Sequence, residues 1–285
     1  METSNIASFG LPPLHDPENV MKGQSRLIDS IVIDAQVTTV VAPLKFDPDI
    51  DSETLTYVIY GEPLQVLGET GPWQLVVSVL DGYLGWVDQG AVSAQVTEPT
   101  HTVCVPMAHM YSSPDLKSNP VKTLPLGSYV AVTGSAQNGF MPLAGGSWVF
   151  ARHIAVVGDY DEDPVSVAEC FIGAPYLWGG RTTLGMDCSG LVQVSLAACG
   201  VRVHRDSSTQ FASLGRQLNE AETPDRGDLA FFPGHVGWML DDKYILHANA
   251  TNMAVTVDPL EDVIGWVAAE TDKPPFSGFK RFDQT

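Results

Sequence analysis

From residue 31 to about residue 157 the sequence is a succession of short β-type runs separated by glycine, proline and aspartate turns. Residues 37–41, 64–67 and 74–79 are typical of these runs. Short apolar and β-branched runs bounded by turn residues indicate strands, and many such strands at regular spacing are typical of small barrels or sandwiches. The N-terminal half of the chain is therefore predicted to be all-β.

This region also contains an internal repeat. Residues 60–68 are similar to residues 126–134, and Gly-Trp-Val at 85–87 is similar to Ser-Trp-Val at 147–149. The offsets, 66 residues from 60 to 126 and 62 residues from 85 to 147, indicate two units of about 60 residues, the size of a small barrel. Both units resemble bacterial SH3-like domains.

An acidic connector at 158–164, Gly-Asp-Tyr-Asp-Glu-Asp-Pro, separates the β region from a different pattern. Two segments with helical spacing follow, and after them four apolar runs between residues 229 and 257 have the length of strands. Helices first and a sheet afterwards predict an α+β domain. The predicted divisions are an extension at 1–30, SH3-like domains at 31–96 and 97–158, and an α+β domain at 159–285.

The charge of the chain limits its partners. Its 285 residues carry a formal charge of −19, so nucleic acid, anionic membranes and anionic wall polymers are repelled over the Debye length. A small polar or zwitterionic ligand fits better. Because no basic segment with an apolar run opens the sequence and no stretch is long enough to span a membrane, we expect a soluble, cytoplasmic protein. No sequence feature indicates an oligomeric state.

Cys188 differs in context from Cys104, Cys170 and Cys199, which form no CxxC pair and are expected to be reduced. It follows a glycine-containing loop and begins an amphipathic segment that ends near residue 198. A helix N-terminus with a nearby imidazolium lowers the pKa of a thiol from about 8.5 to about 3.5–7.5 and offers backbone N–H groups to an oxyanion. Cys188 is therefore predicted to be a nucleophile.

His235 and His247 lie on two apolar runs that the polar residues 241–243 join. If these runs form a hairpin centred near Asp241, the two histidines stand directly opposite each other on one face. His235 is then the general base for Cys188, and His247 orients it and fixes its tautomer. The same three residues could be zinc ligands, which is the competing interpretation, although a fourth ligand at short spacing is absent.

Five segments of the C-terminal domain resemble, in order, the signature segments of NlpC-type peptidases. They are Pro-Tyr-Leu-Trp-Gly-Gly-Arg at 175–181, Gly-Met-Asp-Cys-Ser-Gly-Leu-Val at 185–192, Arg-Asp-Ser-Ser-Thr-Gln at 205–210, Arg-Gly-Asp-Leu-Ala-Phe-Phe at 226–232 and Gly-His-Val-Gly at 234–237. The resemblance implies a papain-like cysteine peptidase. Together with the SH3-like units, it points to one branch, the γ-D-glutamyl-L-diamino acid endopeptidases of murein peptide recycling.

The resemblance implies a catalytic role for four residues and a place in the pocket wall for a fifth. Cys188, His235 and His247 match the family's triad. Tyr176 matches a tyrosine whose hydroxyl assists the oxyanion, beside the backbone N–H of the nucleophile, and Trp178 is expected in the pocket wall. Plain packing is the alternative role for both aromatic residues.

The resemblance also implies a substrate clamp drawn from two domains. An aspartate beside the nucleophile disfavours the thiolate unless a substrate ammonium shares its charge, so Asp187 is expected to bind an N-terminal amine. Helix capping is the alternative role for Asp187, and equally for Asp206 and Ser207. The residues matched to the L-Ala amine, the D-Glu α-carboxylate and the closing wall are Asp187, Ser189, Asp206, Ser207, Tyr83 and Glu62.

The expected reaction is cleavage of the γ-D-glutamyl to diamino-acid bond in murein peptides with a free N-terminal L-Ala, through a thioester on Cys188. The partner is a small peptide, and neither a metal nor an organic cofactor is implied. Diaminopimelate and lysine at the third position are both compatible with the motifs. Two alternatives stay open: a same-fold amidase or acyltransferase acting on other wall-derived amides, and a non-catalytic protein that binds wall peptides.

Overall fold

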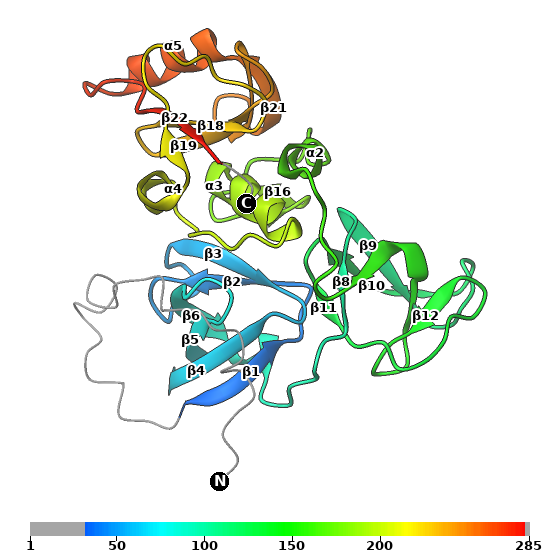
Figure 1. Ribbon diagram of the computed structural model, residues 1–285. Coiled ribbons are helices and arrows are strands. Elements are labelled where there is room, and N and C mark those ends of the chain that lie inside the picture. The colour runs from blue at the N-terminus through cyan, green and yellow to red at the C-terminus, as the bar shows by residue number, and fades with distance from the viewer. Residues whose placement is uncertain (1–31, 283–285) are drawn as a thin grey trace. The chain divides into compact units, whose positions relative to one another are not determined.

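The computed structural model describes residues 32–282, which form two compact units that divide between Asp159 and Tyr160 (Figure 1). The predicted extension at 1–30 lies outside the described residues. Within the described part of the chain, no helix is long and apolar enough to cross a membrane. Each unit is described by itself.

The first unit begins with a seven-stranded antiparallel sheet in the order β3-β2-β6-β5-β4-β1-β7. Its strands are β1 (Ile33–Val37), β2 (Val41–Lys45), β3 (Thr54–Ile59), β4 (Pro63–Thr70), β5 (Trp73–Ser78), β6 (Leu84–Asp88) and β7 (Val92–Ser93). Buried side chains alternate with more exposed ones along β4, as a half-buried strand requires. Leu44, Leu64 and Val87 are among the buried side chains of its core.

A second β assembly follows in the same unit. Its strands are β8 (His101–Val103), β9 (Met107–Tyr111), β10 (Pro120–Pro125), β11 (Tyr129–Val130), β12 (Phe140–Pro142), β13 (Trp148–Phe150) and β14 (Ile154–Val156). They pair as β10-β9-β13-β12 and β11-β8-β14. Both sheets contribute to one core, which contains Val103, Leu124 and Val149.

The predicted repeat is confirmed in the backbone of these two assemblies. The N–H of Gly61 donates to Val37 at 2.9 Å, and 66 residues later the N–H of Gly127 donates to Val103 at the same distance. Both glycines have positive φ, +79° and +83°, a conformation that favours glycine. A 3₁₀ turn, Gln89–Ala91 in one copy, recurs 62 residues later in the other. That the second copy is an SH3-like barrel stays a prediction.

The second unit contains the helices α2 (Pro164–Glu169), α3 (Cys188–Ala198), α4 (Ser207–Ser213) and α5 (Leu260–Glu270). A short hairpin, β15 (Arg181–Thr182) and β16 (Gly185–Met186), precedes α3. Six strands form an antiparallel sheet in the order β17 (Arg216–Gln217), β22 (Gly278–Arg281), β18 (Asp228–Phe232), β19 (His235–Met239), β20 (Tyr244–Asn249) and β21 (Ala254–Pro259). Most helices precede the sheet, in agreement with the predicted α+β order.

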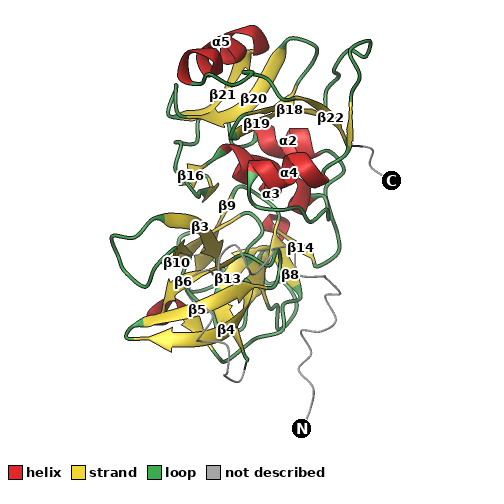
Figure 2. Ribbon diagram, turned by 90° about the vertical axis from the view of Figure 1, so that its left-hand side faces the viewer, coloured by secondary structure: helices red, strands yellow, loops and turns green. Residues whose placement is uncertain are grey.

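Helices α3 and α5 cover opposite faces of this sheet (Figure 2). On one face, the indole N–H of Trp238 donates to Ser195 of α3 at 3.0 Å. On the other, Phe232, Met239 and Ile245 pack against the apolar side of α5. The sequence analysis did not predict α5, although Leu260, Val263, Ile264 and Val267 have the i, i+3, i+4, i+7 spacing of an amphipathic helix.

Candidate active site

Cys188 is the first residue of α3, and Asp187 caps that helix. The Asp187 carboxylate accepts the N–H of Gly190 at 2.7 Å and that of Gly179, across the loop, at 2.8 Å. The helix start also approaches the loop closely, because a Cβ on Gly190 would lie 2.3 Å from the carbonyl oxygen of Gly180. The local sequence therefore fixes where α3 begins and presents the thiol at its N-terminus.

The thiol of Cys188 and the imidazole of His235 are both driven toward their neutral forms. Burial, and secondarily the charge of Asp187, raises the pKa of Cys188 to about 12, although the N–H groups of Val236 and Ser189 act in the opposite direction. Burial and then His247 lower the pKa of His235 to about 3. Since a dry environment disfavours charge, burial favours the thiol form of Cys188 and the neutral imidazole of His235.

His235 and His247 contact each other from neighbouring positions that are not directly opposite, so the predicted hairpin register is wrong. Strand β19 pairs with β20 through Trp238 with Leu246 and Met239 with Ile245, which sets Gly237 across from His247. The two histidines still share a face, and His235 Nε2 lies 2.7 Å from His247 Nδ1. Gly237 makes room for this diagonal contact, because a Cβ there would lie 2.8 Å from the Cβ of His247.

Beyond His247 the contacts continue to Asp258 on β21, which the sequence analysis missed. His247 Nε2 lies 3.1 Å from the Asp258 carboxylate, which also accepts hydrogen bonds from Thr256 and Asn252. If His247 donates its Nε2 proton to Asp258, its Nδ1 accepts the Nε2 proton of His235. The Nδ1 of His235 is then unprotonated and free to accept the thiol proton.

The indole of Trp266 on α5 lies parallel to the ring of His247, with 6.5 Å between the ring centroids and 8° between the planes. His247 itself is fully buried. The helix that the sequence analysis missed therefore helps to hold the orienting histidine.

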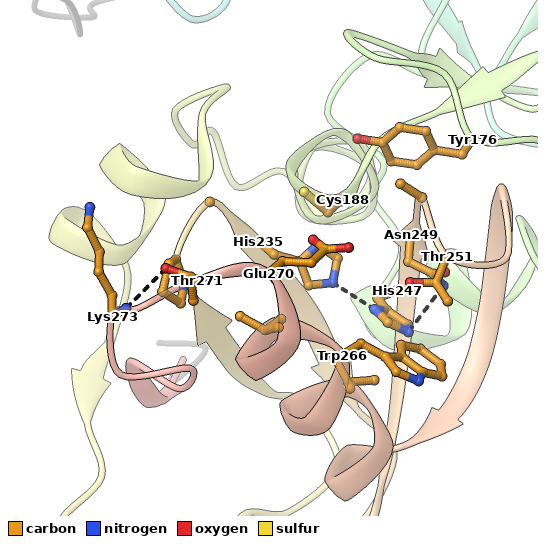
Figure 3. A pocket seen from close by; sticks show the side chains of 15 residues that line it. Tyr176, Cys188, His235, His247, Asn249, Thr251, Trp266, Glu270, Thr271 and Lys273 are labelled. Carbon is orange, nitrogen blue, oxygen red and sulfur yellow. Dashed lines mark hydrogen bonds between the residues drawn. The ribbon is translucent and has the colours of Figure 1, made fainter.

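Tyr176 lies beside the nucleophile, with its hydroxyl turned toward the side of Cys188 (Figure 3). Its own backbone N–H is held by the carbonyl of Met253 at 2.9 Å. Burial and the neighbouring Cys188 and Asp187 raise the pKa of Tyr176 to about 12. The phenol therefore keeps its proton at neutral pH, as a hydrogen-bond donor to an oxyanion requires.

These side chains open onto one cavity of about 540 Å³. It is lined by the triad and Tyr176, by the turns that follow β18 and β20, and by the C-terminal half of α5 (Figure 3). The lining residues are Tyr176, Cys188, Pro233, Gly234, His235, His247, Asn249, Ala250, Thr251, Val263, Trp266, Val267, Glu270, Thr271 and Lys273. Trp178, which we expected in the pocket wall, does not line this cavity and is 60% exposed.

Asp187 and Ser189 form a buried cluster with Arg205, which received no role in the sequence analysis. The Arg205 guanidinium donates to both carboxylate oxygens of Asp187, at 2.9 and 2.5 Å, and to the Ser189 hydroxyl at 2.9 Å. Arg205 is only 1% exposed. Arg205 therefore balances the charge of Asp187 without a substrate ammonium. Helix capping by Asp187 is observed, and its contact with a substrate amine stays a prediction.

Asp206 and Ser207 lie at the start of α4 and are half-buried. Asp206 occupies the N-cap position, yet its side chain makes no capping hydrogen bond to α4. The capping role considered for Asp206 is therefore not observed, and its proposed contact with substrate stays a prediction.

Glu62 and Tyr83 belong to the first unit. The carboxylate of Glu62 accepts the N–H of Ile59 at 3.0 Å within the turn between β3 and β4. Tyr83 is half-buried in the turn before β6, where its N–H donates to Asp81. Glu62 thus has a structural role within its own domain, and the proposed contact of either residue with substrate stays a prediction.

Among residues 32–282, no group of three His, Cys, Asp or Glu side chains has the arrangement of a metal site. The zinc interpretation of Cys188, His235 and His247 therefore has no support in the described part of the chain. All four cysteines are free thiols.

The site combines a thiol at a helix start, a histidine base, a second histidine that orients the base and a tyrosine hydroxyl that can donate. This combination defines a cysteine peptidase site. Comparison with known families agrees: residues 173–266 match the NlpC/P60 family, and residues 41–93 match the bacterial SH3 domain. The chain therefore carries a bacterial SH3 domain and, C-terminal to it in the sequence, an NlpC/P60 peptidase domain.

Among known proteins, the chain is 27% identical over 252 residues to dipeptidyl-peptidase 6 of Lysinibacillus sphaericus, covering 81% of this chain and 93% of that protein. It is 29% identical over 246 residues to the gamma-D-glutamyl-L-lysine dipeptidyl-peptidase of Bacillus subtilis, covering 75% and 78%. A crystal structure of an NlpC/P60 family protein from Bacillus cereus superposes with a TM-score of 0.71 at 20% identity, covering 87% of this chain and 99% of that one. The similarity to that structure concerns the fold.

Proposed function

We propose that this chain is a cysteine endopeptidase that hydrolyses the γ-D-glutamyl to diamino-acid bond of murein peptides with a free N-terminal L-Ala. The observation that carries the proposal is that Cys188, His235 and His247 line one cavity, with His235 Nε2 lying 2.7 Å from His247 Nδ1. The similarity over most of the chain to a gamma-D-glutamyl-L-lysine dipeptidyl-peptidase supports the choice of bond.

In the proposed mechanism the thiol proton moves to Nδ1 of His235 while the sulfur attacks the γ-carbonyl carbon of D-Glu. The oxyanion accepts hydrogen bonds from the backbone N–H of Cys188 and the hydroxyl of Tyr176. His235 then gives its proton to the departing nitrogen, the C–N bond breaks, and a thioester remains. Water, deprotonated by His235, hydrolyses the thioester, which releases L-Ala-D-Glu and restores the thiol.

Asp187, Ser189, Asp206 and Ser207 are proposed to hold the N-terminal amine of L-Ala and the free α-carboxylate of D-Glu. Asp187 and Ser189 stand at the start of α3 beside Cys188, and Asp206 and Ser207 stand at the start of α4. Tyr83 and Glu62 are proposed to close the site around the amine. A requirement for a free amine, together with the charge of −19, favours detached peptides over the anionic wall, and we propose a cytoplasmic role in recycling.

The test is hydrolysis of L-Ala-γ-D-Glu-diaminopimelate and of its N-acetylated form by the wild type and by Cys188→Ala. We expect the wild type to release L-Ala-D-Glu from the free peptide and to cleave the acetylated one at least about 100-fold more slowly, because the ammonium contact is lost. Equal rates on both peptides would contradict amine recognition. Activity in Cys188→Ala would contradict the thioester mechanism.

A further inference from the structure

The active-site cavity extends from the nucleophile past His235 in one direction and to Asn249 and Thr251, after β20, in the other (Figure 3). Because His235 must donate a proton to the departing nitrogen, the leaving residue lies on the His235 side of Cys188. The walls on that side are Pro233 and Gly234 after β18 and the C-terminal half of α5. The residues proposed to hold the acyl part of the substrate do not line this cavity. The part of the cavity on the His235 side is therefore the place for the leaving diamino acid in the proposed reaction.

Glu270 provides the one carboxylate among the described residues that line this cavity. It is the last residue of α5, and its side chain extends from the helix toward Cys188 and His235 (Figure 3). No described residue forms an ion pair or a side-chain hydrogen bond with Glu270, and Lys273, farther along the same wall, does not pair with it. The carboxylate is therefore available to a cation that enters the cavity.

The other α5 residues on this wall are apolar. Val263, Trp266 and Val267 line the cavity together with Glu270. An apolar wall with one carboxylate matches a side chain made of a methylene stem with an ammonium at its tip, since such side chains bury the stem and keep the charged end paired or hydrated.

We propose that Glu270 binds the side-chain ammonium of the leaving diamino acid and so sets the specificity of the pocket. The inference rests on the proposed function, because it concerns the leaving group of that reaction. Lysine and diaminopimelate both carry this ammonium, so Glu270 selects both over residues of equal length that lack it.

The experiment compares two peptides, L-Ala-γ-D-Glu-L-Lys and L-Ala-γ-D-Glu-L-norleucine, whose third side chains differ only in the terminal amine. The wild type is expected to show up to about fivefold higher kcat/KM for the lysine peptide, the effect of one exposed ion pair. In Glu270→Gln this ratio falls close to one, because kcat/KM drops for the lysine peptide alone. In Glu270→Lys the norleucine peptide becomes the better substrate, because two ammonium groups repel each other.

Glu261→Gln is the matched control. Glu261 is an exposed residue in the first turn of the same helix, it does not line the cavity, and the substitution removes the same charge. The ratio is expected to stay at the wild-type value. An unchanged ratio in Glu270→Gln would overturn the assignment of Glu270 while leaving the proposed function intact. Failure of the wild type to cleave either peptide would overturn the proposed function, and the inference with it.

Discussion

At the scale of single residues, the start of α3 combines a paired charge with reacting groups whose neutral forms are favoured by burial. Asp187 is matched by Arg205 at 2.5 Å, and both are buried. Burial raises the pKa of Cys188 and lowers that of His235. The helix N-terminus alone would favour a thiolate, but here desolvation has the larger effect. Burial of the pair thus acts against a resting thiolate and imidazolium.

The state of this pair can be measured directly. We expect the ultraviolet absorbance of a thiolate at Cys188 to be absent near pH 7, and alkylation of Cys188 by iodoacetamide to keep accelerating above about pH 8.5, the ordinary pKa of a thiol. The same measurements on Cys188→Ala give the signal of the other three cysteines, which is subtracted from that of the wild type. A rate that is already constant above about pH 5 would instead indicate a resting thiolate and imidazolium.

Asp258 is the second residue whose role can be tested. Asp258→Asn replaces the carboxylate beside His247 by a neutral amide that can donate as well as accept, so His235 is held less firmly in the required tautomer, and kcat is expected to fall by roughly tenfold with KM little changed. The pH profile of kcat is expected to shift as well, which a change in folding alone does not produce. Asp262→Asn on the exposed side of α5 is the control, and an equal effect of both variants would contradict the assignment.

At the scale of elements, strand register decides how the two histidines meet. The turn between β19 and β20 sets Gly237, not His235, across from His247. His235 is two residues from Gly237, and side chains two residues apart on a strand point to the same face of the sheet. Both histidines therefore lie on one face, although they are not directly opposite each other. Helix α5 then covers that face, and its Trp266 packs along the ring of His247.

Gly237→Ala tests this arrangement. A Cβ at position 237 would lie 2.7 Å from Ile245 and 2.8 Å from the Cβ of His247, so we expect a loss of stability of about 1–3 kcal/mol and a fall in kcat. Gly265→Ala is the control, because nothing lies within 4 Å of a Cβ there. In the middle of α5 it is expected to stabilise the protein by roughly 0.5–1 kcal/mol. Urea denaturation measures both, and equal stabilities would contradict the packing.

At the scale of the whole molecule, the chain joins a repeated β unit to a peptidase unit whose interior holds two titratable histidines. Burial lowers the pKa of both His235 and His247. In the unfolded chain the same residues bind protons near pH 6.5. The peptidase unit is therefore linked to pH through its catalytic centre.

Acid is expected to destabilise the fold between about pH 6.5 and pH 3. In this window the unfolded state binds protons that the folded state excludes, so the free energy of unfolding falls as the pH falls, by roughly 3 kcal/mol for His235 between pH 6.5 and pH 4. Denaturant titrations near pH 7 and near pH 4 measure the loss. His235→Asn is expected to reduce it, and an equal loss in that variant would show that other groups are responsible.

The sequence by itself determined the features that depend on neighbours along the chain. Asp187 caps the helix that begins at Cys188, the acidic connector separates two patterns, and the repeat keeps its 66-residue offset between Gly61 and Gly127. Caps, turns and periodicity are local, so residue order specifies them.

Only the tertiary structure decided which distant residues share a site. It joined Asp258 to His247, set Arg205 against Asp187, and brought α5 with Glu270 to the active-site cavity. Each contact joins residues on different elements whose separation depends on strand register and packing. Desolvation likewise depends on everything that surrounds a group, so the neutral state of Cys188 and His235 follows from burial and not from the motif that contains them.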